Sequence, residues 1–289
     1  MLRKFFIILL VFSYNLAKDR RPSYPFITGD GFRALAQHIL DEEQTFNPLD
    51  VSYKDIIFVG TAYLPFFFNT FLPQISQKIV LISHNHDDPI TNIYQPYIVN
   101  KKIIHWFAQN VDEWTHPKLT PIPIGIENRY NPCGQFIDNV APFIQKYSQN
   151  KDRATAIYAN FRAITHPERS HVQQLLGTHP LATWVPRKNF GEYLADLSKS
   201  IFTLSPRGHG LDCHRTWEAL LMGSYPIVRT STLDPLYKDL PVVILNKWKD
   251  LTKEYLEKKI AEFKNRTFNR EKCYFDYWQE LIKKTQENS

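Results

Sequence analysis

The sequence contains few cysteines and no closely spaced cysteine pair. The three that occur, Cys133, Cys213 and Cys273, lie far apart. Small disulfide scaffolds and structural zinc sites use more cysteines at shorter spacings. The cysteine content therefore argues against both classes, and in an exported chain the odd count leaves at least one thiol unpaired or in an intermolecular bond.

Charge blocks, internal repeats and low-complexity tracts are also missing, and a long apolar run occurs only in the first dozen residues. With 43% hydrophobic and 22% charged residues, the composition is that of a folded globular protein, which excludes disorder, a collagen-like fibre and a multi-span membrane protein. The net charge of +6 is spread along the chain. Such a spread favours an anionic small ligand, and we expect no nucleic-acid partner.

The N-terminus has the layout of a secretory signal. Arg3 and Lys4 precede a short apolar run, 5–12, and polar residues follow it. The run is far shorter than the roughly 20 residues that span a bilayer, and the segment 15–17 is a poor cleavage site. We expect residues 1–20 to be a signal peptide or a membrane tether, with a buried first element as the alternative. The protein is then expected in the lumen of the secretory pathway, exported, or held peripherally at a membrane through its N-terminus.

Apolar strand-like runs alternate with helix-like stretches in both halves of the chain. In the first half the strands are expected at 55–60, 78–83, 102–107 and 119–125. After a polar stretch, 145–153, we expect strands at 154–160, 181–185, 201–205, 225–229 and 241–245, and helices at 167–176, 191–200, 213–222 and 251–263. This twofold β-α-β order predicts two parallel sheets.

The most economical architecture is an α/β fold with two Rossmann-like domains facing each other across a cleft. The expected boundaries are 21–148 for an N-terminal Rossmann-like domain and 149–270 for a C-terminal Rossmann-like domain. Residues 271–289 form an amphipathic C-terminal helix that could cross back to the N-terminal domain.

The segment 205–223 carries the most chemistry. It follows a predicted strand and opens a predicted helix, which is where ligands bind in parallel sheets. Its proline and glycines, Gly208 among them, predict an open loop. Asp212 is expected to be the N-cap of the helix, and Gly223 to end it.

The same segment offers groups for a nucleotide. A helix N-terminus attracts phosphate through its free N–H groups. Arg207 and Arg215 could bind the phosphate oxygens in fork geometry, and Glu218, one turn further on, could accept hydrogen bonds from the two hydroxyls of a ribose. The alternative is a surface ion pair of Arg215 with Glu218, worth about 0.2–0.5 kcal/mol, which leaves the glycines and Arg207 unexplained.

The run SPRGHGLDCHRTWEALLMGSYPIV, residues 205–228, resembles the C-terminal signature of exostosin-like glycosyltransferases, a family with the GT-B fold. The resemblance implies a donor, expected to be a UDP- or GDP-sugar, in the C-terminal half and a glycan or glycoconjugate acceptor in the N-terminal half. It assigns Arg207, Arg215 and Glu218 to the nucleotide, and Asp212 and His214 to the neighbourhood of the transferred sugar. No metal is expected, because GT-B enzymes usually neutralise the leaving diphosphate with arginines and helix dipoles. The chain lacks the long stem of the better-known animal members.

Two further arginines follow the first strand of the second half. Arg162 is expected at the side of the predicted cleft, and Arg169 at the start of the next helix. Either could bind the β-phosphate of the donor, and an ordinary surface position is the alternative for each.

A cluster of histidines and aspartates follows a predicted strand of the first half, at 84–88. Such a cluster could hold a metal, and a metal-assisted hydrolase is therefore a second hypothesis for the function. In an inverting sugar transfer, a carboxylate or imidazole must take the acceptor proton, and the candidates are His86, Asp87, Asp88 and Glu127. A plain polar loop would look the same, and a non-catalytic glycan-binding protein of this fold is the third hypothesis.

Overall fold

The computed structural model describes residues 18–147 and 152–288. The predicted signal or tether, 1–20, thus lies outside the described residues except for its last three positions. Within the described ranges, no helix combines the length and the apolar character that crossing a membrane requires.

The N-terminal half contains a five-stranded parallel sheet whose spatial order follows the chain. Every residue of its second and third strands is buried. A parallel sheet covered on both faces requires such continuous apolar runs, which explains why these strands were predictable. The strands are β1 (His38–Leu40), β2 (Ile56–Gly60), β3 (Ile79–His84), β4 (Ile103–Ala108) and β5 (Leu119–Pro121).

The C-terminal half contains a second parallel sheet, in the order β10-β9-β8-β6-β7. The first of its strands along the chain, β6, has β7 on one side and β8 on the other. The strand order reverses between β6 and β8, and ligands bind at this point in open α/β sheets. The strands are β6 (Thr155–Ala159), β7 (Ala182–Trp184), β8 (Ser200–Leu204), β9 (Tyr225–Arg229) and β10 (Val243–Leu245). The prediction of an α/β fold with two Rossmann-like parallel sheets is confirmed.

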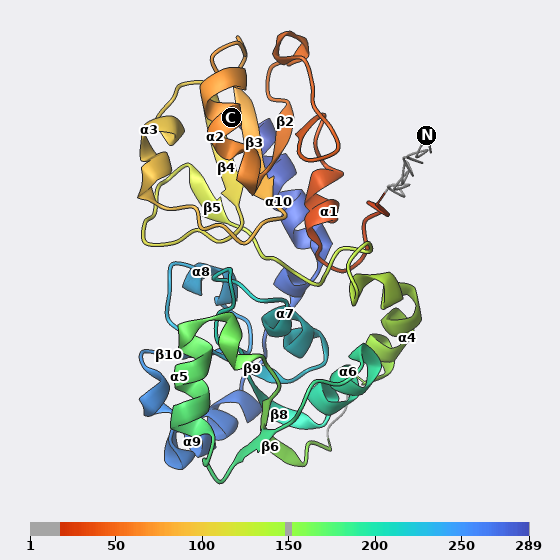
Figure 1. Ribbon diagram of the computed structural model, residues 1–289, viewed down its shortest axis with the longest axis vertical. Coiled ribbons are helices and arrows are strands. Elements are labelled where there is room, and N and C mark those ends of the chain that lie inside the picture. Colours follow the sequence, from red (N-terminus) through yellow and green to blue (C-terminus); the bar gives the residue numbers. More distant parts are fainter. Residues whose placement is uncertain (1–17, 148–151, 289) are drawn as a thin grey trace, which may run out of the picture.

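Helices connect the strands in both halves, and Figure 1 shows the two halves one above the other. The helices are α1 (Gly29–Arg33), α2 (Leu64–Phe66), α3 (Gln95–Ile98), α4 (Ile137–Tyr147), α5 (Pro167–Leu176), α6 (Phe190–Ser198), α7 (His214–Leu221), α8 (Asp234–Tyr237), α9 (Lys253–Lys264) and α10 (Phe275–Glu287). A π-helix, η3 (Phe67–Phe71), continues α2, and short 3-10 turns occur at η1 (Pro48–Asp50), η2 (Thr61–Tyr63), η4 (Asn92–Tyr94), η5 (Gly134–Phe136), η6 (Ala163–Thr165), η7 (Trp248–Asp250) and η8 (Glu271–Cys273).

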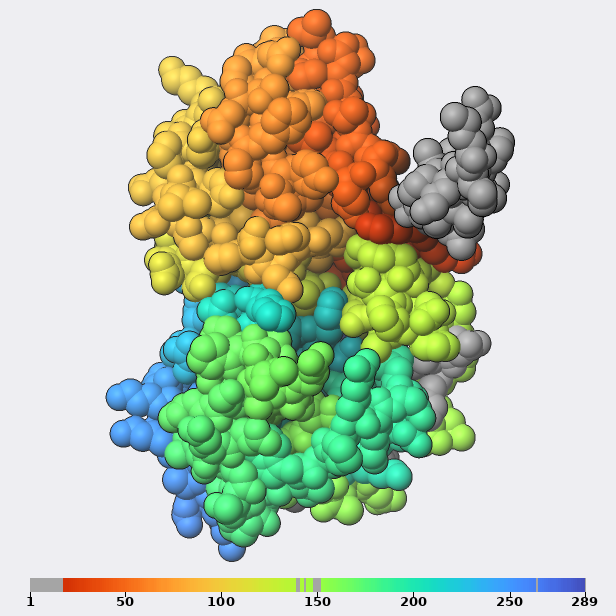
Figure 2. Space-filling model, in the orientation of Figure 1, coloured from red at the N-terminus to blue at the C-terminus, as the bar shows by residue number. Residues whose placement is uncertain are grey.

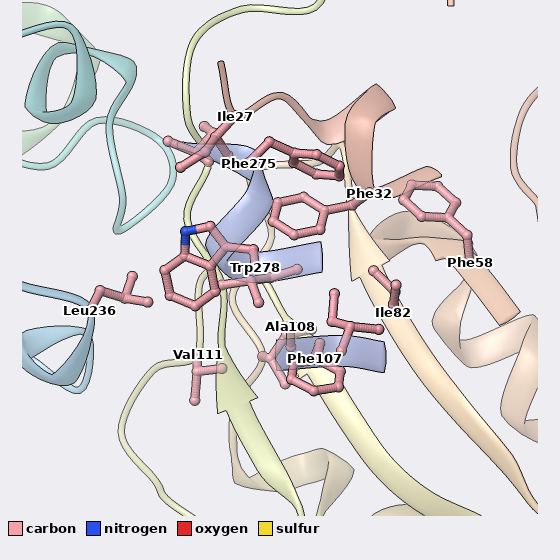
Figure 3. Packing of buried hydrophobic residues seen from close by; sticks show 14 of the residues in the cluster. Ile27, Phe32, Phe58, Ile82, Phe107, Ala108, Val111, Leu236, Phe275 and Trp278 are labelled. Atoms are coloured by element: carbon pink, nitrogen blue, oxygen red, sulfur yellow. The ribbon is translucent and has the colours of Figure 1, made fainter. Parts of the chain in front are cut away.

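The last helix, α10, lies against the N-terminal half (Figure 1). Phe275 packs edge-on against Phe32 of α1, with ring centroids 5.3 Å apart. Trp278 lies among N-terminal residues and near Leu236 of the C-terminal half (Figure 3). One apolar cluster therefore includes residues of both halves and holds them together, while the C-terminal sheet has a second cluster of its own.

Candidate functional site

Two adjoining cavities lie between the halves of the molecule. The large cavity, of about 610 Å³, is lined mainly by the C-terminal half, and the small cavity, of about 320 Å³, by the N-terminal half. Asp87, Ile124 and His214 line both cavities, so the cavities meet at these residues. Figure 2 shows the hollow between the halves, with blue-green atoms of the segment around α7 in its depth.

The loop after β8 encloses a buried arginine of the large cavity. Arg169, in the first turn of α5, is 9% exposed and donates from Nε to the carbonyl oxygens of Pro206 at 3.3 Å and Arg207 at 3.0 Å. Burial lowers the pKa of its guanidinium. Loop and arginine thus fix each other at the switch point between β6 and β8.

A third cavity, of about 560 Å³, adjoins the large one and is rich in arginine. Arg169, Arg187 and Arg215 line both cavities. Arg162 lines only this third one, where Glu127 is the acidic residue of the lining. Among these cations, Arg215 has a buried Nε that finds no partner among the described residues. With four arginines and one glutamate, the lining of this cavity has an excess of positive charge, which suits an anion.

Glu218 lies in the wall of the large cavity, 7% exposed. Its Oε2 accepts a hydrogen bond of 2.8 Å from the hydroxyl of Tyr193 on α6. Burial raises the pKa of its carboxyl. Between the described side chains of Arg215 and Glu218 there is no ion pair, so a solvated surface pair does not account for these two residues.

The structure separates Arg207 from the other predicted phosphate ligands. Its Nη1 lies 3.5 Å from Oδ2 of Asp112 in the N-terminal half. The side chain lines a separate space of about 20 Å³ beside Glu168 and not the large cavity. Of the expected nucleotide ligands, Arg215 and Glu218 therefore lie together, with Gly208, and Arg207 lies apart.

The prediction that Asp212 caps α7 is wrong. The N-cap is Cys213, which makes no side-chain capping bond. The Asp212 carboxylate, 3% exposed, accepts at Oδ2 from the backbone N–H of Ile124 and from Nε1 of Trp217, each at 2.8 Å. Since its oxygens are taken by such partners, Asp212 ties α7 to the N-terminal half. At the other end of the helix, Gly223 has a φ of 75°, as expected of a residue that ends a helix.

The candidate bases of the N-terminal half lie at different places. Asp87 lines both the large and the small cavity. His86 lines the small cavity, and its Nδ1 lies 3.2 Å from Oδ2 of the exposed Asp88. Glu127 lines the large cavity and accepts a 3.0 Å hydrogen bond from the backbone N–H of Cys133.

The histidine and aspartate cluster does not assemble a metal site. In 18–147 and 152–288, no three or more His, Cys, Asp and Glu side chains are grouped so as to hold a metal ion. His84 is buried, with Nε2 3.1 Å from the Pro123 carbonyl oxygen and Nδ1 accepting from the Asn85 N–H at 2.7 Å. Burial lowers the pKa of its imidazole to about 4. The metal-assisted hydrolase hypothesis therefore has no ligand set in the described part of the chain.

Sequence reasoning missed the amide side chains of the small cavity. Asn85, Gln109 and Asn128 line it together with the hydroxyl-bearing Tyr130. The Asn85 Oδ1 accepts from Asn128 Nδ2 at 2.9 Å, and the Asn85 N–H donates to Gln109 Oε1 at 3.1 Å. Asn85 and Gln109 directly follow β3 and β4, and polar residues at the carboxyl ends of neighbouring parallel strands were the signal that could have identified them.

The comparison with protein-family models agrees with the resemblance that the segment 205–228 predicts. Residues 160–288 match the family model of the RXYLT1 C-terminal domain, an exostosin-family glycosyltransferase-like domain. The predicted resemblance is thereby confirmed. No curated protein matched the sequence.

Among solved structures, one titled "Crystal structure of GtfA/B complex" aligns at 11% sequence identity and a TM-score of 0.35. The alignment covers 82% of this chain and 55% of that one, so this chain spans about half the length of its neighbour.

Proposed function

We propose that this chain, whose residues 160–288 match the model of the RXYLT1 C-terminal domain, transfers a sugar from a nucleoside diphosphate donor to a hydroxyl group of a glycan or glycoconjugate. In this proposal the two domains have the GT-B arrangement. The observation that carries it is the junction, at Asp87 and His214, of the arginine-bearing large cavity with the small cavity that is lined by amide side chains.

The large cavity suits the donor, a UDP- or GDP-sugar. Arg169, Arg187 and Arg215 can bind diphosphate oxygens, and each charge-assisted hydrogen bond contributes about 1.5–3 kcal/mol. Glu218 can accept from a ribose hydroxyl. Departure of the diphosphate leaves negative charge on its oxygens, which these arginines would stabilise.

The small cavity suits a sugar acceptor. Amide side chains both donate and accept hydrogen bonds, as sugar hydroxyls do. Asn85, Gln109 and Asn128 are already held in place by hydrogen bonds. A hydroxyl-rich ligand would therefore meet oriented groups, and no charged acceptor is required. The signal-like N-terminus supports a location in the secretory pathway, exported or at a membrane.

A donor screen tests this proposal. Release of nucleotide is measured with UDP- and GDP-sugars and an oligosaccharide panel, in the presence of EDTA. We expect release from one donor class, and its loss in Arg215→Ala. Stabilisation by zinc or manganese without any nucleotide effect would favour the hydrolase instead, and a response to oligosaccharides alone would favour a glycan-binding protein.

A further inference from the structure

The imidazole of His214 has a fixed proton position. Its Nδ1 lies 2.8 Å from the carbonyl oxygen of Gly125, across the boundary between the halves. A carbonyl oxygen only accepts hydrogen bonds, so Nδ1 must carry a proton. In the neutral ring, Nε2 is then a free acceptor.

The backbone on both sides of this contact is held rigidly. Gly125 has a φ of 67°, and a Cβ atom there would lie 2.1 Å from the carbonyl oxygen of Ile27. Only glycine can therefore present its carbonyl group in this way. Two residues before His214, the Asp212 carboxylate binds the N–H of Ile124, the neighbour of Gly125. The two hydrogen bonds fix the start of α7 against the segment after β5.

The remaining nitrogen of the ring lies where the two substrates would meet. His214 lines both the large and the small cavity, and its Nε2 makes no hydrogen bond to any residue that the structure describes. Among the competing groups, Glu127 accepts from the N–H of Cys133, and Glu218 from Tyr193. Asp87 also lines both cavities, but it is exposed and belongs to a loop. His214, in contrast, is the first residue of a helix.

From this geometry, and resting on the proposed function, we propose that His214 is the general base of the transfer. Its Nε2 takes the proton of the acceptor hydroxyl, and that oxygen forms a bond to the anomeric carbon of the donor sugar. The bond from this carbon to the diphosphate oxygen breaks, and its electron pair leaves with the diphosphate. The step is a single displacement that needs no other reactant.

The surroundings of His214 suit this role. Glu218, one helical turn further on, interacts electrostatically with His214. Its carboxylate would stabilise the imidazolium that forms when Nε2 takes the proton. The carbonyl of Gly125 continues to accept from Nδ1 in both protonation states, so proton uptake requires no rearrangement of the ring.

The test uses His214→Asn in the full chain. The asparagine Nδ2 can replace Nδ1 as donor to Gly125, while the base is removed. His171→Asn, on the exposed face of α5, is the matched control. Binding of UDP and GDP is measured by calorimetry, and nucleotide release with the UDP- and GDP-sugar panel.

We expect His214→Asn to bind UDP or GDP within about twofold of the parent and to release nucleotide about 100-fold more slowly or worse, the scale of general base catalysis. Release within a few-fold of the parent, or an affinity that falls together with the rate, overturns the assignment of the base. A parent that binds neither UDP nor GDP overturns the proposed function itself.

The tautomer of His214 can be measured in the parent chain, so this second test does not depend on the folding of the variant. In the parent chain labelled with ¹⁵N-histidine, the NMR signals of the neutral imidazole of His214 should show the proton on Nδ1 and none on Nε2. A neutral ring protonated at Nε2 contradicts the proposal.

Discussion

The guanidinium of Arg169 lies directly against the backbone of Gly208. A Cβ atom at this glycine would lie 2.9 Å from Nη2 of the arginine. The arginine cannot withdraw freely, because its Nε donates to the carbonyl oxygens of Pro206 and Arg207. The loop after β8 and a buried cation of the large cavity therefore depend on each other.

Substitution of Gly208 by alanine should displace the Arg169 guanidinium. We expect Gly208→Ala to weaken binding of UDP or GDP by about 10-fold, the loss of one charge-assisted hydrogen bond, as measured by isothermal titration calorimetry. Gly191→Ala is the control, since a Cβ at Gly191 makes only an ordinary contact of 3.7 Å with Asn189. Equal affinities of the two variants would contradict the proposed role of Arg169.

Arg215 and Glu218 should both contribute to nucleotide affinity. Arg215→Ala and Glu218→Ala are each expected to weaken UDP or GDP binding by more than about 1.5 kcal/mol, because each removes a charged hydrogen-bonding partner. Arg21→Ala, which removes an exposed arginine paired with Asp19, should leave the affinity unchanged. Parent-like binding by both cavity variants shows that the site is elsewhere.

Asp212 should be required for stability because its carboxylate accepts from several donors at once. In Asp212→Asn, an amide NH₂ group replaces one of the two carboxylate oxygens. This NH₂ group then faces either the N–H groups of Ile124 and Trp217 or the N–H group of Cys213. We expect a loss of about 1–3 kcal/mol in the free energy of unfolding, the penalty for an unsatisfied buried group. Urea titrations of variant and parent measure it, and an unchanged midpoint argues against this network.

Acid should destabilise the protein through His84. Because the pKa of the folded state, about 4, lies below the ordinary 6.5, the unfolded chain binds the proton first as the pH falls. The contribution of His84 to the free energy of unfolding is fully present above pH 6.5 and is lost between pH 6.5 and 4. The total loss is on the order of 3 kcal/mol.

His84→Gln isolates this effect, since the glutamine amide can still donate to Pro123. The free energy of unfolding of the variant should fall less between pH 7 and pH 4.5 than that of the parent. His105, whose pKa burial also lowers to about 4, is present in both proteins and cancels in the difference. Parallel pH profiles would show that His84 is not the group responsible.

The sheets were predictable because parallel strands buried on both faces appear as continuous apolar runs. The strand β1 was missed, since it has only three residues and His38 and Ile39 are half-buried. The helix α1 was missed as well. It contains Gly29 and Gly31, which disfavour a helix in isolation but allow close packing on Asn85 and Phe275.

The site was only partly predictable, because a sequence does not show which way a loop side chain points. Arg207 and Arg169 have the same chemistry, yet Arg207 lies toward Asp112 and Arg169 lines the large cavity. Asp212 has the sequence position of a helix cap, but its partner Ile124 comes from the other half of the chain. Contacts over such distances arise only when the two halves pack together.

A crystal structure with bound UDP or GDP tests the central claim most directly. The account predicts the diphosphate in the large cavity, within hydrogen-bond distance of Arg169, Arg187 or Arg215, and the ribose beside Glu218. A nucleotide bound outside this cavity, or no bound nucleotide at saturating concentration, would contradict it.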